Sequence, residues 1–228
     1  MNFRTVLHQT ATIMNQAYDH PDQQFSPACE RNKVPILEQL ISRLAAVHRV
    51  LEIGSGTGQH AAYFSLHLPQ LRWQTSDRIE NHASIRAWIE QSGCSNALMP
   101  VDLDVAQSNW PAEQFDAVFT ANTCHIMSWP EVEKMFQGTS QVLNDHGHFI
   151  VYGPFNYAGQ FTSHSNQLFD ASLKSQAALR GIRDLQEILP LAQKNQLLLS
   201  DDIDMPANNR LLLFTKKINE NFTEQNSL

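Results

Sequence analysis

The chain has few cysteines and no cysteine motif. Its three cysteines, Cys29, Cys94 and Cys124, are far apart in a sequence of 228 residues, and none belongs to a CxxC pair. This spacing excludes a zinc site or a redox dithiol built from cysteines, and we expect three reduced thiols. His146 and His148 bracket a glycine in a predicted turn and have no third ligand in register, so we predict no metal site.

Long apolar runs and clusters of basic residues are also absent. No window approaches the roughly 18 consecutive apolar residues of a transmembrane helix. Residues 1–20 are polar and charged, which argues against a secretory signal and leaves the cytoplasm as the expected location. Lys and Arg are scattered, and the formal net charge is -7. A phosphate backbone would meet no positive field, so we expect neither nucleic acid nor a membrane as partner.

What the sequence does contain is an alternation of strands and helices. The first predicted element is a helix with Asn32 as N-cap and Pro35 in its first turn. Strands are predicted at 49–53, 71–76, 97–101, 115–120, 148–153, 197–203 and 210–215. Further helices are predicted at 59–68, 80–91, 130–143 and 185–192. The alternation predicts an α/β fold with a mostly parallel seven-stranded sheet and helices on both faces. The last two strands have no helix between them, so they should form a hairpin that places one antiparallel strand in the sheet.

The length suits a single domain. We expect it over residues 26–217, with an N-terminal arm at 1–25 and a polar tail at 218–228. Residues 155–183 follow the fifth strand and are rich in Asn, Ser, Tyr and Phe, and we predict that they cover the site as a lid or acceptor wall.

The first predicted strand runs into a glycine-rich loop with GxGxG spacing, formed by Gly54, Ser55, Gly56, Thr57 and Gly58, with Glu52 two residues before it. Open α/β sheets bind ligands at this end of the strand, and glycine lets the backbone approach a ligand closely. The following helix start favours an anion. The segment resembles motif I of class I methyltransferases, which have a Rossmann-like fold. The resemblance implies S-adenosylmethionine as cofactor, bound by Glu52, Gly54, Ser55, Gly56 and Gly58.

Acidic residues follow the next two strands. Asp77 ends the second strand, where a carboxylate can accept both hydroxyls of a ribose, and Arg78 beside it is included in the predicted site. A helix N-cap is the alternative role for Asp77. The methyltransferase resemblance further implies that Asp104 meets the adenine amino group and the backbone of Val105 a ring nitrogen, with Asp102 as the alternative carboxylate.

The segment after the fourth strand, Phe119 to His125, resembles the part of these enzymes that lies beside the methionine moiety and the transferable methyl group. The resemblance makes Asn122 a cofactor contact, and we predict that Asn122 and His125 face the reaction centre. His125 suits a general base, since an ordinary histidine has a pKa near neutrality, although a plain hydrogen-bonding role is equally open. His60 follows the glycine loop, and cofactor contact and helix packing are both open for it.

Further segments point to one family. They are Ser26–Lys33, Phe161–Asn166 with Phe169 and Asp170, Gly181–Asp184 and Met205–Asn209. With the glycine loop they resemble a methyltransferase-like domain of unknown function over residues 26–216, although His164 stands where that pattern has glutamate. Guanidinium and amide groups can orient a polar acceptor or a carboxylate, so we predict substrate contacts for Arg31, Asn32, Tyr152, Asn208 and Asn209, with structural roles as the alternative.

The sequence therefore predicts an S-adenosylmethionine-dependent methyltransferase that acts on a small molecule. An NAD(P)-dependent oxidoreductase would share the strand, the glycine loop and the ribose acid, but the GxGxG spacing and the closing hairpin count against it. A non-catalytic S-adenosylmethionine-binding or scaffold protein is the third possibility, because no obvious general base stands out.

Overall fold

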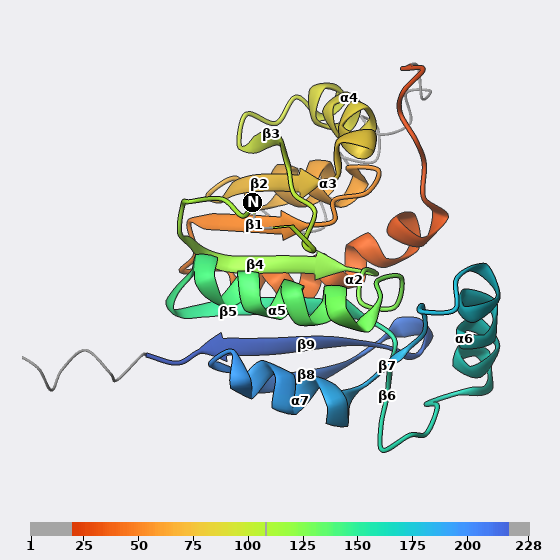
Figure 1. Cartoon of the computed structure of the whole chain (residues 1–228). Helices are drawn as coiled ribbons and strands as arrows, with labels where there is room; N and C mark the ends of the chain where they lie inside the picture. Colours follow the sequence, from red (N-terminus) through yellow and green to blue (C-terminus); the bar gives the residue numbers. More distant parts are fainter. Residues whose placement is uncertain (1–19, 108, 219–228) are drawn as a thin grey trace, which may run out of the picture.

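The computed structural model describes residues 20–107 and 109–218, and within them a single seven-stranded sheet lies between two layers of helices (Figure 1). Its strands are β1 (Arg49–Ile53), β2 (Arg72–Asp77), β3 (Ala97–Asp102), β4 (Phe115–Ala121), β5 (Leu143–Gly153), β8 (Leu197–Met205) and β9 (Asn209–Lys216). Their order is β3-β2-β1-β4-β5-β9-β8, and β9 runs antiparallel to both of its neighbours. The predicted mostly parallel sheet with one antiparallel strand is confirmed.

The helices divide between the two faces of the sheet. Helices α2 (Pro27–Arg43) and α3 (Gln59–His67) cover one face, with α4 (His82–Ser92) beside α3, and α5 (Trp129–Val142) and α7 (Leu185–Lys194) cover the other. Strand β1 shows how the sequence produces these layers. Val50 packs into the cluster under α2 and α3, whereas Leu51 packs into the cluster under α5 and α7, because successive side chains of a strand point to opposite faces.

The predicted start of the first helix is wrong. Helix α2 begins at Pro27, and its N-cap Ser26 accepts a hydrogen bond from the Cys29 N–H at 3.3 Å. Serine as N-cap followed by proline in the first turn is a strong start signal, because the serine oxygen satisfies a free N–H and proline has none to satisfy. Asn32 therefore lies buried within the helix, and Pro35 is accommodated in its interior.

The insert between β5 and α7 contains elements that the sequence did not predict. Helix α6 (His164–Gln176) lies beyond the carboxyl ends of the parallel strands, and β6 (Phe155–Asn156) pairs in parallel with β7 (Arg183–Asp184). Short 3-10 turns precede α4 and β9. The predicted arm and tail lie mostly outside the described residues. No described helix combines the length and apolar character that a membrane crossing requires.

Candidate functional site

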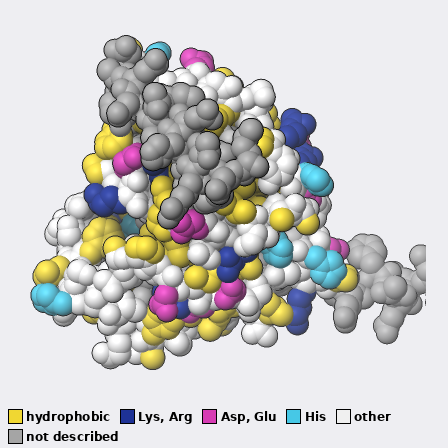
Figure 2. Space-filling model, turned by 180° about the vertical axis from the view of Figure 1, so that it is seen from behind, with side chains coloured by type: hydrophobic (Ala, Val, Ile, Leu, Met, Phe, Trp, Pro, Cys, Tyr) yellow, Lys and Arg dark blue, Asp and Glu magenta, His cyan; other side chains and the backbone are white. Residues whose placement is uncertain are grey.

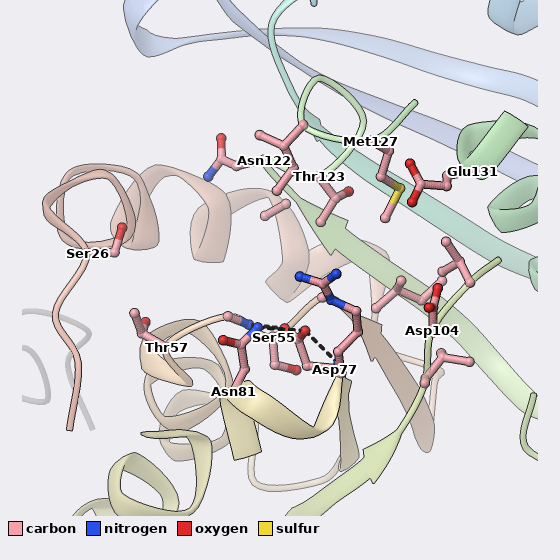
Figure 3. Close-up of a pocket in the computed structure, with 18 of the residues that line it drawn as sticks. Ser26, Ser55, Thr57, Asp77, Asn81, Asp104, Asn122, Thr123, Met127 and Glu131 are labelled. Atoms are coloured by element: carbon pink, nitrogen blue, oxygen red, sulfur yellow. Dashed lines mark hydrogen bonds between the residues drawn. The ribbon is translucent and has the colours of Figure 1, made fainter. Parts of the chain in front are cut away.

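A cavity of about 690 Å³ opens where β1, β2, β3 and β4 end (Figure 3). The chain leaves β1 for α3 on one face of the sheet and leaves β4 for α5 on the other. Adjacent strands whose connections diverge in this way leave a crevice between them, and this is the usual ligand site of an open α/β sheet. The cavity therefore lies where the sequence predicts the site.

The glycine loop forms one wall of this cavity. Gly54 and Gly56 both have positive φ, +69° and +58°, and both line the cavity together with Ser55. A Cβ on Gly54 would lie 2.7 Å from Cγ2 of Thr123, whereas a Cβ on Gly56 would meet no atom closer than 4.0 Å. The loop thus presents bare backbone to a ligand. Gly58 differs from its predicted role, because it does not line the cavity and packs against Ile85 of α4.

Asp77 is buried at the end of β2 and faces the glycine loop. Its Oδ2 accepts a hydrogen bond from the Gly56 N–H at 2.7 Å, and its Oδ1 accepts from the Arg78 N–H at 2.7 Å and from Asn81 Nδ2 at 2.8 Å. The N-cap of α4 is Asn81, so Asp77 does not have the capping role that was its alternative. Its carboxylate belongs to the cavity wall, and Arg78 beside it also lines the cavity.

Glu52 lies beneath the loop and does not line the cavity, so it supports the site from behind. Its Oε2 accepts hydrogen bonds from Ser55 Oγ at 2.9 Å and from the Trp73 indole N–H at 3.1 Å. Complete burial raises the pKa of Glu52 to about 7, although both hydrogen bonds favour the charged form. The predicted cofactor residue is thus a buried acid that supports Ser55.

The raised pKa of Glu52 predicts how stability depends on pH. The native state binds the Glu52 proton more tightly than the unfolded chain does, so this group stabilises the fold most below its ordinary pKa and loses that contribution as the pH rises to about 7. The substitution Glu52→Gln keeps an acceptor oxygen and removes the titration. Between pH 5 and 8, wild type should lose on the order of 2 kcal/mol of unfolding free energy relative to Glu52→Gln, measured by urea denaturation. Parallel curves for the two proteins would contradict the assignment.

The opposite end of the cavity is more apolar. Leu103, Val105 and Met127 line it together with the carboxylates of Asp104 and Glu131. Figure 3 shows Asp104 and Glu131 on one side of the cavity and Ser26 and Thr57 on the other. Asp102, the alternative to Asp104, is exposed and does not line the cavity. Two predicted residues, Asp104 and Val105, therefore belong to this wall.

The two predicted catalytic residues are in different places. Asn122 lines the cavity, has φ +60°, and its N–H donates to the Tyr152 carbonyl at 2.9 Å. His125 does not line the cavity, and its ring meets Phe169 of α6 edge-on with centroids 5.2 Å apart. Burial, with the positive charges of Arg183 and Arg180, lowers the pKa of His125 to about 4. The predicted role of His125 at a reaction centre is therefore not supported by its position, because its ring packs against α6 and not into the cavity.

None of the five predicted substrate residues lines the cavity. Arg31 is exposed, and Asn208 is an exposed residue with φ +58° whose carbonyl accepts from Asn166 Nδ2. Asn32 is buried and its Oδ1 lies 2.7 Å from His60 Nε2. The phenol of Tyr152 hydrogen-bonds to the side chains of Asn32 and Asn209. Three of the five therefore meet one another behind the wall, because they pack between α2 and the sheet.

Several lining residues escaped prediction because distant segments supply them. Ser26, Ala28 and Cys29 come from the start of α2, and Ala177, Leu179 and Arg180 come from the insert, which supports its predicted role as a wall. Gln59 Oε1 accepts from the Ser26 N–H at 2.5 Å and so ties α2 to the glycine loop. The Ser-Pro pair at residue 26 was the one local signal that could have placed α2 here.

Arg183 holds two of these wall segments together. Its guanidinium donates to the carbonyls of Cys124 at 3.0 Å and Leu179 at 2.9 Å, and also to the carbonyl of Met127. The loop after β4 and the insert are thereby joined through one side chain. Among residues 20–107 and 109–218, no three His, Cys, Asp or Glu side chains come together in a way that could hold a metal ion.

Comparison with known proteins identifies the family. A family model described as protein of unknown function (DUF938) matches residues 23–216. The chain belongs to the DUF938 family. This agrees with the resemblance to a domain of unknown function. The match covers the whole domain and does not single out the segments Ser26–Lys33 and Met205–Asn209 that suggested the resemblance.

Solved structures show the fold of this DUF938 protein. An O-methyltransferase family protein from Burkholderia thailandensis superposes with a TM-score of 0.75 at 14% identity, covering 93% of this chain and 64% of that one. PigF, solved with SAH, gives 0.71 at 14% identity, covering 82% and 56%. The mitomycin 7-O-methyltransferase MmcR gives 0.67 at 13% identity, covering 94% and 67%. The DUF938 chain thus has the Rossmann-like class I methyltransferase fold, and spans about 64% of the length of the Burkholderia protein.

Proposed function

We propose that this protein is an S-adenosylmethionine-dependent methyltransferase that acts on a small molecule. The observation that carries the proposal is the position of Asp77, whose carboxylate lies 2.7 Å from the Gly56 N–H in the wall of the cavity. A carboxylate beside an open glycine backbone suits a ribose next to an amino-acid moiety.

The residues of the cavity fit such a cofactor along its whole length. Gly56 leaves room at the backbone, Asp77 faces the middle of the cavity, and Leu103 and Val105 with Asp104 suit an adenine ring and its amino group. The volume of about 690 Å³ is within the roughly 300–1,000 Å³ that small-ligand pockets occupy.

When bound, S-adenosylmethionine supplies an electrophilic methyl group on sulfur. The displacement is in line, so the chain has to align the acceptor and exclude water, and needs no nucleophile of its own. The insert suits this purpose, since Ala177, Leu179 and Arg180 of the insert line the cavity. Asn122 directly follows β4, lies beside the methyl position that the resemblance implies, and lines the cavity.

The surface charge of the protein and the names of its structural neighbours both favour a small molecule as methyl acceptor. Lys, Arg, Asp and Glu side chains are mixed on the face shown in Figure 2. With a net charge of -7, the chain offers little attraction to a polyanion. MmcR is named for methylation of mitomycin, a small molecule, and PigF was solved with SAH. These names support the substrate class that we propose.

Ligand binding to the purified protein tests the proposal. Isothermal titration with S-adenosylmethionine, S-adenosylhomocysteine and NAD should show saturable binding of the first two and none of NAD. A concentration 100 times the Kd should stabilise the protein against urea by about 2.7 kcal/mol. Tight binding of NAD without binding of S-adenosylmethionine would replace this proposal by the oxidoreductase alternative.

A further inference from the structure

A row of four polar side chains runs from the cavity into the protein beneath α2. His60 Nε2 lies 2.7 Å from Asn32 Oδ1, and the side chains of Asn32 and Asn209 both hydrogen-bond to the phenol of Tyr152. The four residues come from α3, α2, β9 and β5, and only His60 lines the cavity. Side chains from three other elements therefore form a connected row that ends at one histidine of the cavity wall.

The hydrogen bond to Asn32 decides which nitrogen of His60 carries the proton. An amide oxygen can only accept, so Nε2 must donate to it, and in the neutral ring Nδ1 is left with a lone pair. Among residues 20–107 and 109–218, the hydrogen bond of His60 runs through Nε2, and no side chain or backbone group hydrogen-bonds to Nδ1. The structure therefore presents an unprotonated nitrogen in a residue of the cavity wall.

The ring of His60 is also fixed and uncharged. It stacks on Phe64 with centroids 5.1 Å apart, and Phe119 lies edge-on at 6.4 Å. Burial, assisted by the charge of Lys33, lowers the pKa of His60 to about 4. At neutral pH the ring is consequently neutral and able to accept a proton.

The place of His60 in the cavity indicates what it meets. It lies three residues after Thr57 and contacts Asn32 of α2, the helix that Ser26 caps. Figure 3 shows Ser26 and Thr57 on the side of the cavity opposite Asp104 and Glu131. If the adenine lay at the Asp104 end, as the proposed function implies, the amino-acid part and the transferable methyl group would lie toward the glycine loop and His60. An acceptor approaching that methyl group has to enter the same end of the cavity.

We propose that His60 Nδ1 accepts the proton of a neutral hydroxyl or amine acceptor during methyl transfer, and that Asn32, Tyr152 and Asn209 position it. This inference rests on the proposed function. The acceptor lone pair forms the new bond to the methyl carbon, and the carbon–sulfur bond breaks with its electrons remaining on sulfur. The acceptor proton passes to Nδ1, and the imidazolium releases it to solvent after the product leaves. The substrate class is a small alcohol, phenol or amine, because a carboxylate acceptor would have no proton to give.

The variant His60→Gln tests the role of His60, with His67→Gln on the same helix as matched control, since His67 does not line the cavity. Calorimetry should give the same Kd for S-adenosylmethionine in wild type and both variants. Formation of S-adenosylhomocysteine from a panel of phenols, alcohols and amines, with a metabolite extract as a further source, should fall by about 10²-fold or more in His60→Gln only. Thermal unfolding of each variant confirms that it is folded.

Each outcome separates the two proposals. If wild type binds no S-adenosylmethionine, or binds it and methylates nothing, the proposed function fails and this inference with it. If wild type turns over and His60→Gln keeps its rate, or loses affinity for S-adenosylmethionine tenfold, the inference alone is overturned. Nitrogen-15 NMR of the unliganded protein gives a readout independent of activity. It should show His60 protonated at Nε2 and neutral at pH 7, and a proton on Nδ1 would overturn the inference.

Variants of Asn32 test the positioning role. Asn32→Asp keeps the acceptor oxygen and adds a negative charge, so the pKa of His60 should rise and the acid limb of the pH–rate profile should move to higher pH. Asn32→Leu removes the acceptor and should give NMR signals of a tautomer mixture. The other groups near the ring, Lys33 on α2 and Tyr152 on β5, are unchanged in both variants. A profile identical to wild type in Asn32→Asp would show that Asn32 has only a structural role.

Discussion

Replacing Asp77 with asparagine should weaken S-adenosylmethionine binding by about 100-fold, or about 2.7 kcal/mol. An asparagine has one acceptor oxygen where the carboxylate has two, and its NH₂ group would confront either the Gly56 N–H or a ribose hydroxyl. The loss should appear in calorimetric titrations as a higher Kd. Because the carboxylate also accepts from Arg78 and Asn81, some loss of stability should accompany it.

The matched control is Asp102→Asn. Asp102 is the residue of β3 paired with Asp77 across the sheet, but it is exposed and outside the cavity. Its substitution should leave the Kd within about twofold of wild type, since a surface carboxylate far from the ligand contributes little. Equal affinities for Asp77→Asn and wild type would remove the observation on which the proposed function depends.

The second large effect is expected for Gly58→Ala. Gly58 has φ +93°, and an added Cβ would lie 2.8 Å from the Ile85 Cα and 3.2 Å from the Trp88 Cβ. Backbone cannot yield as a side chain can, so α4 would have to move away from α3. Strain at positive φ and this overlap together should cost about 3–5 kcal/mol, and should lower the Tm by roughly 10 °C in a thermal scan.

Gly93→Ala provides the comparison for Gly58→Ala. Gly93 also has positive φ, +67°, but an added Cβ there would meet nothing within 4 Å. Its substitution should cost only about 1 kcal/mol, the price of the backbone conformation alone. Similar unfolding free energies for the two variants would show that Gly58 does not depend on its contact with α4.

The sheet and half of the site could be predicted because their signals are local. A buried strand followed by Gly54, Gly56 and an acid at Asp77 lies within one unit of the chain, and the direction of parallel strands brings their carboxyl ends to one edge. The hairpin of β8 and β9 was equally visible, since the absence of an intervening helix leaves the chain no parallel crossover.

The remaining features depend on contacts between distant segments. Asn32 reads as a helix start in sequence, but the Ser26–Pro27 pair starts α2 earlier and turns Asn32 inward onto His60, 28 residues away. His125 follows a promising strand, yet its ring packs against Phe169 of an insert whose helix no pattern predicted. The residue types of Asn32 and His125 made them candidates for the site. Only the packing of distant segments shows whether such a candidate reaches the cavity.

The hydrogen bonds of Arg183 hold the insert, which forms part of the cavity wall, in a fixed position. Arg183 lies in the insert, as Leu179 does, so the insert can part from the loop after β4 only if the contacts to the carbonyls of Cys124 and Met127 are both released. Contacts of a charged donor are worth about 1.5–3 kcal/mol each, so such an opening is rare. We therefore expect this wall to select small molecules by its fixed shape and not by closing over them after they bind.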